Sequence, residues 1–119
     1  MDERLKEALE MSSYMVSLSR QKQYIKSKFE EDVVYYEHGG ALSANVELIN
    51  YLKTLKDLGY TDAVVLDSNG LPVKIPDVET FLNKTLDVYH QALNEYVTEF
   101  EKMKKSRRNV LSLIDGDDE

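Results

Sequence analysis

The chain has 119 residues, which is enough for one domain with a real hydrophobic core. Hydrophobic residues make up 42% and charged residues 31%, and the formal net charge is −7. Such an acidic balance disfavours sequence-independent binding to nucleic-acid phosphates, unless the 15 basic residues cluster. The absence of cysteine excludes disulfides, thiolate metal sites and cysteine nucleophiles.

The start of the chain, Met1-Asp2-Glu3-Arg4, is acidic and lacks the basic start and apolar run of a signal peptide. The densest apolar run, Ala63-Val64-Val65-Leu66, is too short to cross a bilayer. We therefore expect a soluble protein of the cytoplasm.

The first predicted helix covers residues 3–37, which contain no glycine or proline. Its apolar residues step by three, four or seven and so share one face, while Lys22 and Asp32 interrupt that face. These two charges either specify register with a partner or lie with their stems at the edge of the face. Gly39-Gly40 supplies the cap and turn that end the helix. The apolar face consists of Met11, Met15, Leu18, Ile25, Phe29, Val33 and Tyr36.

A second, shorter helix follows, with Ser43 or Asn45 as its N-cap. Gly59 stands where a Schellman cap requires a glycine, and Tyr60 can then fold back onto Leu55. The apolar face of this helix consists of Val46, Ile49, Leu52, Leu55 and Leu58.

Residues 63–75 predict a β-hairpin, because Asn69-Gly70 is the pair that a two-residue type I′ turn prefers. In that register Leu66 faces Val73, and apolar side chains separate from polar ones. A three-residue loop with a bulge at Gly70 would shift the pairing by one residue and mix the two faces. We prefer the first register. Its apolar side consists of Val64, Leu66, Leu71, Val73 and Ile75.

The last predicted helix begins at Pro76-Asp77, with Asp77 as cap, and runs to Ile114 without glycine or proline. Two rows of positions step by seven and alternate by four and three, which is the heptad pattern of a helical seam. A helix of this length needs another helix to cover its seam. The first row is Leu82, Tyr89, Tyr96, Met103 and Val110, and the second is Leu86, Leu93, Phe100, Arg107 and Ile114, of which Arg107 alone is not apolar.

These elements predict a mainly α fold. Two long antiparallel helices, similar to a coiled coil, carry a short helix and a β-hairpin at the connecting end. Residues 1–114 form a single helical domain and residues 115–119 an acidic tail. The alternative is a homomeric coiled coil made by the last helix.

Five basic residues crowd the end of the last helix. They either bind phosphates or an acidic partner, or they complement the carbonyl end of the helix dipole and pair with the acidic tail or with Glu7 and Glu10. The second interpretation is the simpler one. The basic patch consists of Lys102, Lys104, Lys105, Arg107 and Arg108.

No motif predicts a catalytic residue, a metal site or a cofactor. His38 and His90 lack the spacing of zinc hydrolases, and the sequence has neither a nucleophile elbow nor a phosphate-binding glycine loop. Asp67-Ser68-Asn69-Gly70 fails as a calcium loop, because Val65 would have to be its first ligand.

The last half of the chain resembles small proteins of T4-like tailed phages, notably those of marine cyanobacteria. The resemblance is carried by Val65–Ile75, by Tyr89–Tyr96 and by Lys104–Arg108. It implies a viral origin, a place in the virion or the host cytoplasm, and a role in assembly or host takeover.

The leading hypothesis is a non-enzymatic interaction or assembly protein, a homo-oligomer or part of a larger assembly, whose helical seam holds its partners. The alternative is an acidic inhibitor or adaptor that binds a host enzyme of nucleic-acid metabolism, with carboxylates where phosphates would lie. Direct binding to nucleic acid or membranes is not favoured by the sequence.

Overall fold

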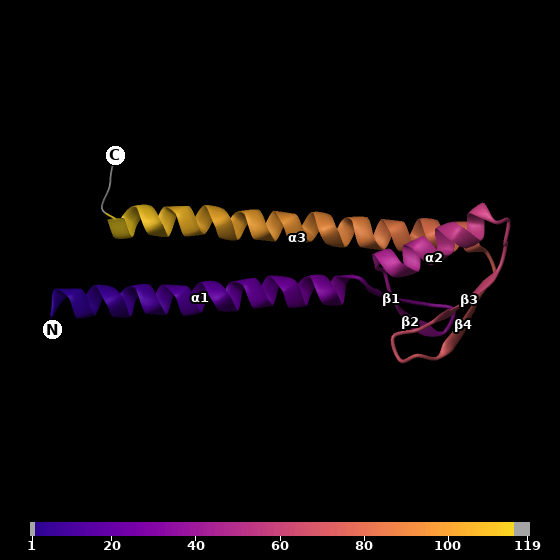
Figure 1. Ribbon diagram of the computed structural model, residues 1–119, viewed down its shortest axis with the longest axis horizontal. Coiled ribbons are helices and arrows are strands. Elements are labelled where there is room, and N and C mark those ends of the chain that lie inside the picture. Colours follow the sequence, from indigo (N-terminus) through magenta and orange to yellow (C-terminus); the bar gives the residue numbers. More distant parts are fainter. Residues whose placement is uncertain (1, 116–119) are drawn as a thin grey trace. The chain divides into compact units, whose positions relative to one another are not determined.

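The computed structural model describes residues 2–115, without the side chains of residue 107 and residues 109–115. The predicted mainly helical fold with two long helices is confirmed (Figure 1). The contacts divide the chain into a helical unit, made of residues up to Lys28 and from Tyr96 onward, and a mixed unit, Phe29–Glu95. The elements are α1 (Glu3–Asp32), β1 (Val34–Glu37), β2 (Gly40–Ser43), α2 (Val46–Asp57), β3 (Ala63–Leu66), β4 (Pro72–Ile75) and α3 (Val78–Asp115).

The prediction that the first helix reaches residue 37 is wrong, because α1 ends at Asp32 and a strand begins at Val34. Residues 33–36 are Val-Val-Tyr-Tyr, and β-branched and aromatic side chains favour strands over helices. Their apolar character fitted the helical spacing of the residues before them, which is why the sequence alone suggested a continuous helix.

A hairpin that the sequence analysis missed therefore joins β1 and β2, with Tyr35 opposite Leu42 and Glu37 opposite Gly40. His38 and Gly39 form its two-residue turn, both with positive φ (51° and 83°). Positive φ at both central residues is the requirement of a type I′ turn. The paired glycines thus serve a hairpin turn and not the cap of a helix.

The predicted second helix is confirmed as α2. Asn45 is its N-cap, and the Asn45 side chain accepts a hydrogen bond from the Leu48 amide at 2.8 Å. At the other end the Gly59 amide donates to Lys56 and the Tyr60 amide to Leu55, the bonds of the predicted Schellman cap. On its apolar face Leu52 is fully buried and Leu58 is exposed.

The hairpin at residues 63–75 exists, but its preferred register is wrong. Leu66 pairs with Pro72, and Val65 pairs with Val73, one residue away from the predicted partners. The Gly70 amide donates to the Asp67 carbonyl, and Gly70 has a φ of 79°, as in a type I turn followed by a glycine bulge.

The Asp67 side chain explains this choice of turn. Its carboxylate accepts hydrogen bonds from the Asn69 amide at 2.9 Å and the Leu71 amide at 2.8 Å, which stabilise the longer loop. Because a shift of one residue turns a strand over, Val65 faces the core while Val64 and Leu66 are exposed.

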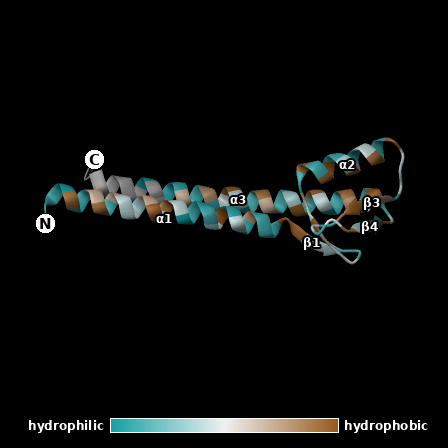
Figure 2. Ribbon diagram, turned by 60° about the horizontal axis from the view of Figure 1, so that its bottom comes forward, coloured by the Kyte–Doolittle hydropathy of each residue, from teal (hydrophilic) through white to brown (hydrophobic). Residues whose placement is uncertain are grey.

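The core of the mixed unit gathers side chains of the strands and α2 around the first turns of α3. In Figure 2 the hydrophobic parts of these elements lie at the same end of α3. A two-stranded ribbon is marginal by itself, so both hairpins depend on this core. Its buried members are Tyr35, Leu42, Ala44, Leu52, Val65, Val73, Ile75, Val78, Phe81 and Leu82.

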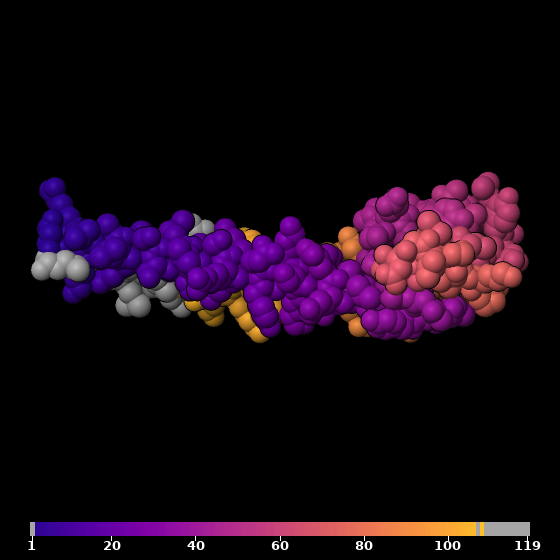
Figure 3. Space-filling view, turned by 90° about the horizontal axis from the view of Figure 1, so that it is seen from below, coloured from indigo at the N-terminus to yellow at the C-terminus, as the bar shows by residue number. Residues whose placement is uncertain are grey.

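The two hairpins also contact each other, and the space-filling view shows the salmon surface of β3 and β4 beside the purple surface of β1 and β2 (Figure 3). The Ser68 amide donates to the Ala41 carbonyl at 2.7 Å. Gly40 is buried at this contact, and a Cβ placed on it would lie 2.6 Å from Cγ2 of Val73. A side chain at residue 40 is therefore excluded unless Val73 moves.

Asp77 caps α3 as predicted, because its carboxylate accepts hydrogen bonds from the Thr80 hydroxyl at 2.9 Å and the Thr80 amide at 3.2 Å. The hydroxyl bond is the main cause that lowers the pKa of Asp77, and the two amide bonds from Thr80 and Glu79 add to it.

The buried face of α3 keeps a seven-residue spacing, but its second row is displaced by one residue from the predicted one and runs through Val78, Thr85 and Ala92. Thr85 and Ala92 are buried, whereas Leu86 and Leu93 of the predicted seam are about 40% exposed (42% and 40%). Of the other seam residues, Leu82 and Met103 are buried, Tyr89, Tyr96 and Phe100 are half-buried, and the side chains of Arg107, Val110 and Ile114 lie outside the described part.

We expect Gly40→Ala to lower the free energy of unfolding by about 1–3 kcal/mol, because the added methyl group overpacks the hairpin contact. Adding Val73→Ala removes the atom that the methyl group meets. The double variant should then lose less stability than the sum of the two single variants, as measured in a denaturant-unfolding cycle. If the stability losses of the two single variants simply add in the double variant, the proposed contact between residue 40 and Val73 is contradicted.

The lowered pKa of Asp77 predicts a pH dependence of stability. Because the folded-state pKa lies below the unfolded value of 3.8, the stabilisation is present above that value and is lost as the pH falls through the folded pKa. Asp77→Ala should therefore be less stable than the natural chain at neutral pH, with a difference that shrinks at acidic pH. Asp62→Ala, in an exposed loop, is the matched control, and an equal pH dependence in both variants would contradict the cap.

Candidate functional site

In the helical unit, α1 and α3 run in opposite directions and contact each other (Figure 1). Leu18, Ile25 and Met103 form a small buried cluster, and Tyr96 and Phe100 pack against it. The predicted pairing of the two long helices is thus observed over these residues.

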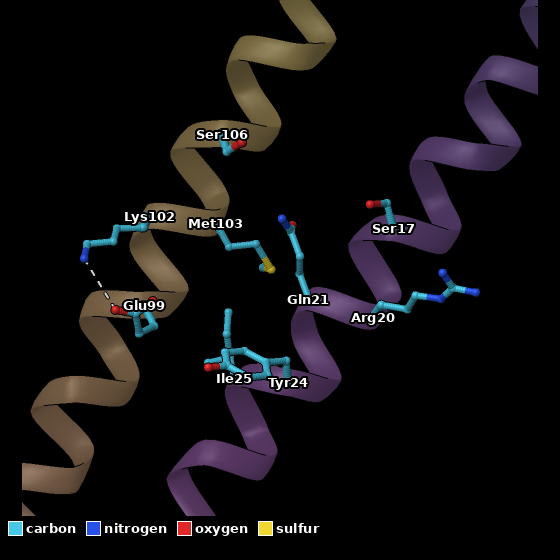
Figure 4. A pocket seen from close by; sticks show the side chains of 9 residues that line it. All are labelled: Ser17, Arg20, Gln21, Tyr24, Ile25, Glu99, Lys102, Met103 and Ser106. Carbon is cyan, nitrogen blue, oxygen red and sulfur yellow. Dashed lines mark hydrogen bonds and ion pairs between the residues drawn. The ribbon is translucent and has the colours of Figure 1, made fainter.

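An open groove of about 410 Å³ lies along this helix pair, and we call it the helix-pair groove. In Figure 4, Gln21 and Met103 point toward each other across it, while Arg20 and Lys102 extend to opposite sides. Lys102 pairs with Glu99 at 3.4 Å, and Tyr24 is 67% exposed. The other lining residues are Ser17, Ile25 and Ser106.

Four residues of the predicted basic patch, Lys102, Lys104, Lys105 and Arg108, are exposed on α3 in this unit. Lys104 lies over the ring of Phe100, with 5.1 Å between Nζ and the ring centroid. Ser106 lines the helix-pair groove together with Ser17. The side chain of Arg107 lies outside the described part, so its predicted pairing with Glu7 and Glu10 stays a prediction.

The helix dipole does not account for the basic patch. It acts within the last turn of a helix, and α3 has no basic residue in its last turn, because it continues to Asp115. Asp115 begins the predicted acidic tail, of which residues 116–119 lie outside the described residues. The helix dipole therefore does not account for the patch, whereas its pairing with the acidic tail stays a prediction.

A second apolar surface lies on the other side of α1. Leu9 is nine residues from Leu18, which is two and a half turns, so the two side chains point in opposite directions. Leu5 and Val16 share the face of Leu9 through spacings of four and seven. All three are about half exposed (52%, 53% and 49% for Leu5, Leu9 and Val16). We call these three residues the outer α1 face.

The mixed unit has a groove of its own, about 730 Å³ in volume, between α2 and β3. Its wall contains the exposed side chains of Tyr51, Val64 and Leu66, and the Tyr51 hydroxyl donates to the Val64 carbonyl at 3.3 Å. Within the described residues, β3 pairs with β4 alone, so its other edge faces this groove without a strand. The charged residues in the lining are Glu47 and Asp67.

A buried polar contact joins β1 to α3. The Thr85 hydroxyl donates to the Phe81 carbonyl at 2.8 Å, so the Tyr35 hydroxyl must be the donor in its hydrogen bond with Thr85. Burial raises the pKa of Tyr35, and the carboxylate of Glu37 adds to this rise. Oε2 of Glu37 is buried without a hydrogen bond among the described residues. The arrangement holds a strand on a helix and opens into neither groove.

The histidines occupy structural positions. His38 is one of the two residues of the β1–β2 turn, and its ring centroid lies 6.2 Å from that of Phe81. Nε2 of His90 lies 3.4 Å from Nδ2, the side-chain amide nitrogen, of Asn94. Residues 2–115 contain no group of three His, Cys, Asp or Glu side chains that could hold a metal ion.

Sequence reasoning found the basic patch and the Asn69-Gly70 turn, but it missed the outer α1 face and the helix-pair groove. The outer α1 face has a heptad-like spacing that could have been found, had the more continuous stripe through Leu18 and Ile25 not been preferred. The groove depends on the register of two helices that are distant in sequence, which no local pattern gives.

Comparison with known protein families, curated proteins and solved structures found no match for this chain. No helix in the described part combines the length and the apolar character that a bilayer crossing requires.

We expect Tyr35→Phe to lower the free energy of unfolding by about 0.5–1.5 kcal/mol, the typical contribution of one hydrogen bond. Thr85 keeps its bond to Phe81, so no buried donor is left unpaired. Because the pKa of Tyr35 is raised on folding, its contribution is intact below about pH 10 and is lost as the pH rises through the folded pKa. The natural chain should thus lose more stability than Tyr35→Phe in alkaline denaturation. Parallel curves for the two proteins would show that the hydroxyl is not buried.

Proposed function

We propose that this chain is a non-enzymatic interaction and assembly protein, and that the outer α1 face is where a second protein chain packs. The observation that carries the proposal is the poor burial of α1. Of the described side chains in this 30-residue helix, Leu18 and Ile25 are buried, whereas Leu5, Leu9 and Val16 are about half exposed.

The energetics support an occupied face. Full burial of one large aliphatic side chain contributes about 1.5–3 kcal/mol. Because Leu5, Leu9 and Val16 are already about half buried, covering each of them in an association would contribute about half of that. A two-helix pair with a small core is marginal in water, and four-helix bundles are the common way in which such pairs complete their core. Positions 5, 9 and 16 have the four-and-seven spacing that lets another helix lie along them.

A second copy of the chain is the partner that we propose first, because the surface is then self-complementary in the sense of a twofold dimer. The resemblance of the last half of the chain to small proteins of T4-like phages agrees with this role. In that setting the chain would be a virion or assembly component in an infected cell.

The polar groups with shifted pKa values also agree with a non-enzymatic role. Tyr35 is engaged in a buried hydrogen bond between a strand and a helix, and Asp77 in the cap of α3. Each shift therefore has a structural cause and lies outside both grooves.

The charge of the mixed unit supports the second candidate, an acidic inhibitor or adaptor of a nucleic-acid enzyme. Residues 29–95 carry 12 acidic residues and four lysines, so this unit alone is strongly negative. Carboxylates presented this densely can occupy the site of nucleic-acid phosphates on a basic enzyme. Such binding would weaken steeply with salt, which assembly through an apolar face would not.

The assembly proposal is tested by Leu9→Asp. We expect the natural chain to form a dimer or larger oligomer in sedimentation equilibrium, and Leu9→Asp to raise its dissociation constant at least tenfold, because a charge enters the interface (roughly 1.4 kcal/mol or more). Thermal unfolding of the monomer should change little, since Leu9 is about half exposed.

Leu18→Asp is the matched control, because it places the same charge in the buried cluster of the helical unit and should destabilise the fold itself. A natural chain that stays monomeric at every concentration, or a Leu9→Asp variant that associates as the natural chain does, would refute the outer α1 face as the interface.

A further inference from the structure

The positive charge of the chain is gathered in the helical unit. The mixed unit has four lysines, Lys53, Lys56, Lys74 and Lys84, so the other 11 of the 15 basic residues lie in residues 2–28 and 96–108. The net charge of −7 is therefore distributed unevenly, because the mixed unit is strongly negative and the helical unit contains most of the basic residues. An acidic chain can still bind nucleic acid if its basic residues cluster, and in the helical unit they do.

Pairing of the helices brings two basic segments together. Residues 11–28 of α1 and 102–108 of α3 contain no acidic residue. The helix-pair groove is lined by Ser17 and Ser106 at one end and by Ile25 and Glu99 at the other, so the segments overlap along the pair (Figure 4). At 1.5 Å per residue, residues 11–28 extend over roughly 26 Å of the pair and residues 102–108 over roughly 9 Å. The basic residues in these segments are Arg20, Lys22, Lys26, Lys28, Lys102, Lys104, Lys105, Arg107 and Arg108.

The helix dipole does not account for Arg20, Lys22 and Lys26, or for the basic residues of α3 at 102–108. Neither long helix has a basic residue in its last turn, and the last turn of α1 holds Glu30, Glu31 and Asp32. Lys102 pairs with Glu99 on the surface, where such pairs contribute little.

An aromatic ring accompanies the charges. Tyr24 lines the helix-pair groove one turn after Arg20 on α1 and is 67% exposed, so its ring is open to solvent. A cationic groove that carries an exposed aromatic ring is the combination that binds single strands, because phosphates contact the cations and an unpaired base stacks on the ring.

We propose that the helix-pair groove binds single-stranded nucleic acid, with its phosphates on Arg20, Lys102 and the neighbouring basic residues and a base on Tyr24. A single strand fits better than a duplex, because the bases of a duplex are already stacked on each other and cannot use the ring. The strongly acidic mixed unit repels phosphates, which confines the strand to the helical unit. Arg20 follows Val16 by four residues and so lies on the side of α1 that carries the outer α1 face, whereas Lys102 lies on α3.

The test is fluorescence anisotropy of the full-length chain with a labelled oligothymidylate of about 12 nucleotides, within the range of single-strand sites. We expect binding at low salt that weakens as salt rises, with a log–log slope of about −0.7 for each phosphate contacted. Arg20→Glu combined with Lys102→Glu should lower the affinity at least tenfold and make the slope less steep.

The matched control combines Lys53→Glu with Lys56→Glu, which changes the net charge equally but lies on α2 in the mixed unit. It should leave the affinity within about twofold, since charges beyond a Debye length are largely screened. Tyr24→Leu keeps every charge and removes the ring, and should lower single-strand affinity by roughly 5- to 100-fold, as loss of one stacked base does.

Four results would overturn the proposal. The natural chain could fail to bind the oligonucleotide at low salt, or the two double variants could lose affinity equally. Tyr24→Leu could bind the single strand as tightly as the natural chain does, while the natural chain binds a duplex of the same length as tightly as the single strand. Finally, Lys102→Glu alone, which leaves α1 and its outer face unchanged, could bind the oligonucleotide as tightly as the natural chain does. If Arg20→Glu with Lys102→Glu does not fold, as judged by circular dichroism, Lys22→Glu with Lys26→Glu replaces it.

Discussion

Both hairpins depend on the first turns of α3. Two-stranded ribbons bury too little surface to stand alone in water, and this chain has two of them. Val78, Phe81 and Leu82 provide the surface on which the strands and α2 pack, and Thr85 anchors β1 through Tyr35. The Asp77 cap fixes where this helix begins, and so where that surface lies. The groove of the mixed unit lies between α2 and β3, and both of these elements contribute side chains to the core that contains Val78, Phe81 and Leu82.

Much of the fold could be read from local chemistry. Asn45, Gly59 and Asp77 each perform the capping role that their residue type and position predict. These predictions succeeded because a cap involves atoms only a few residues apart. The long pair of helices also followed from the spacing of apolar residues over many turns.

The failures arose where two local signals competed or where tertiary contacts decided. At residues 33–36 the apolar spacing continued the helix, while the strand preference of valine and tyrosine ended it, and the hairpin won. At residues 63–75 the Asn69-Gly70 pair suggested a two-residue turn, but the Asp67 carboxylate and the bond from Ser68 to Ala41 favoured the longer loop. The candidate groove could not be predicted at all, because it requires the register between helices that are about 80 residues apart.

The two units differ in how well the chain covers its own apolar surface and in the sign of their charge. The mixed unit has a filled core and an acidic surface, and the helical unit has a small cluster, exposed leucines and most of the basic residues. A chain that completes one unit by itself and leaves the other open is suited to joining other molecules. The open unit is accordingly where both proposals place their contacts.

The close approach at Gly40 has an evolutionary consequence. With less than the width of a methyl group between residue 40 and Val73, neither position can drift independently of the other. Distant relatives should either retain glycine and valine together or exchange both, with a larger residue in the first strand pair matched by a smaller one in the second. Such paired changes would reveal common ancestry between chains whose overall identity has fallen too low to show it.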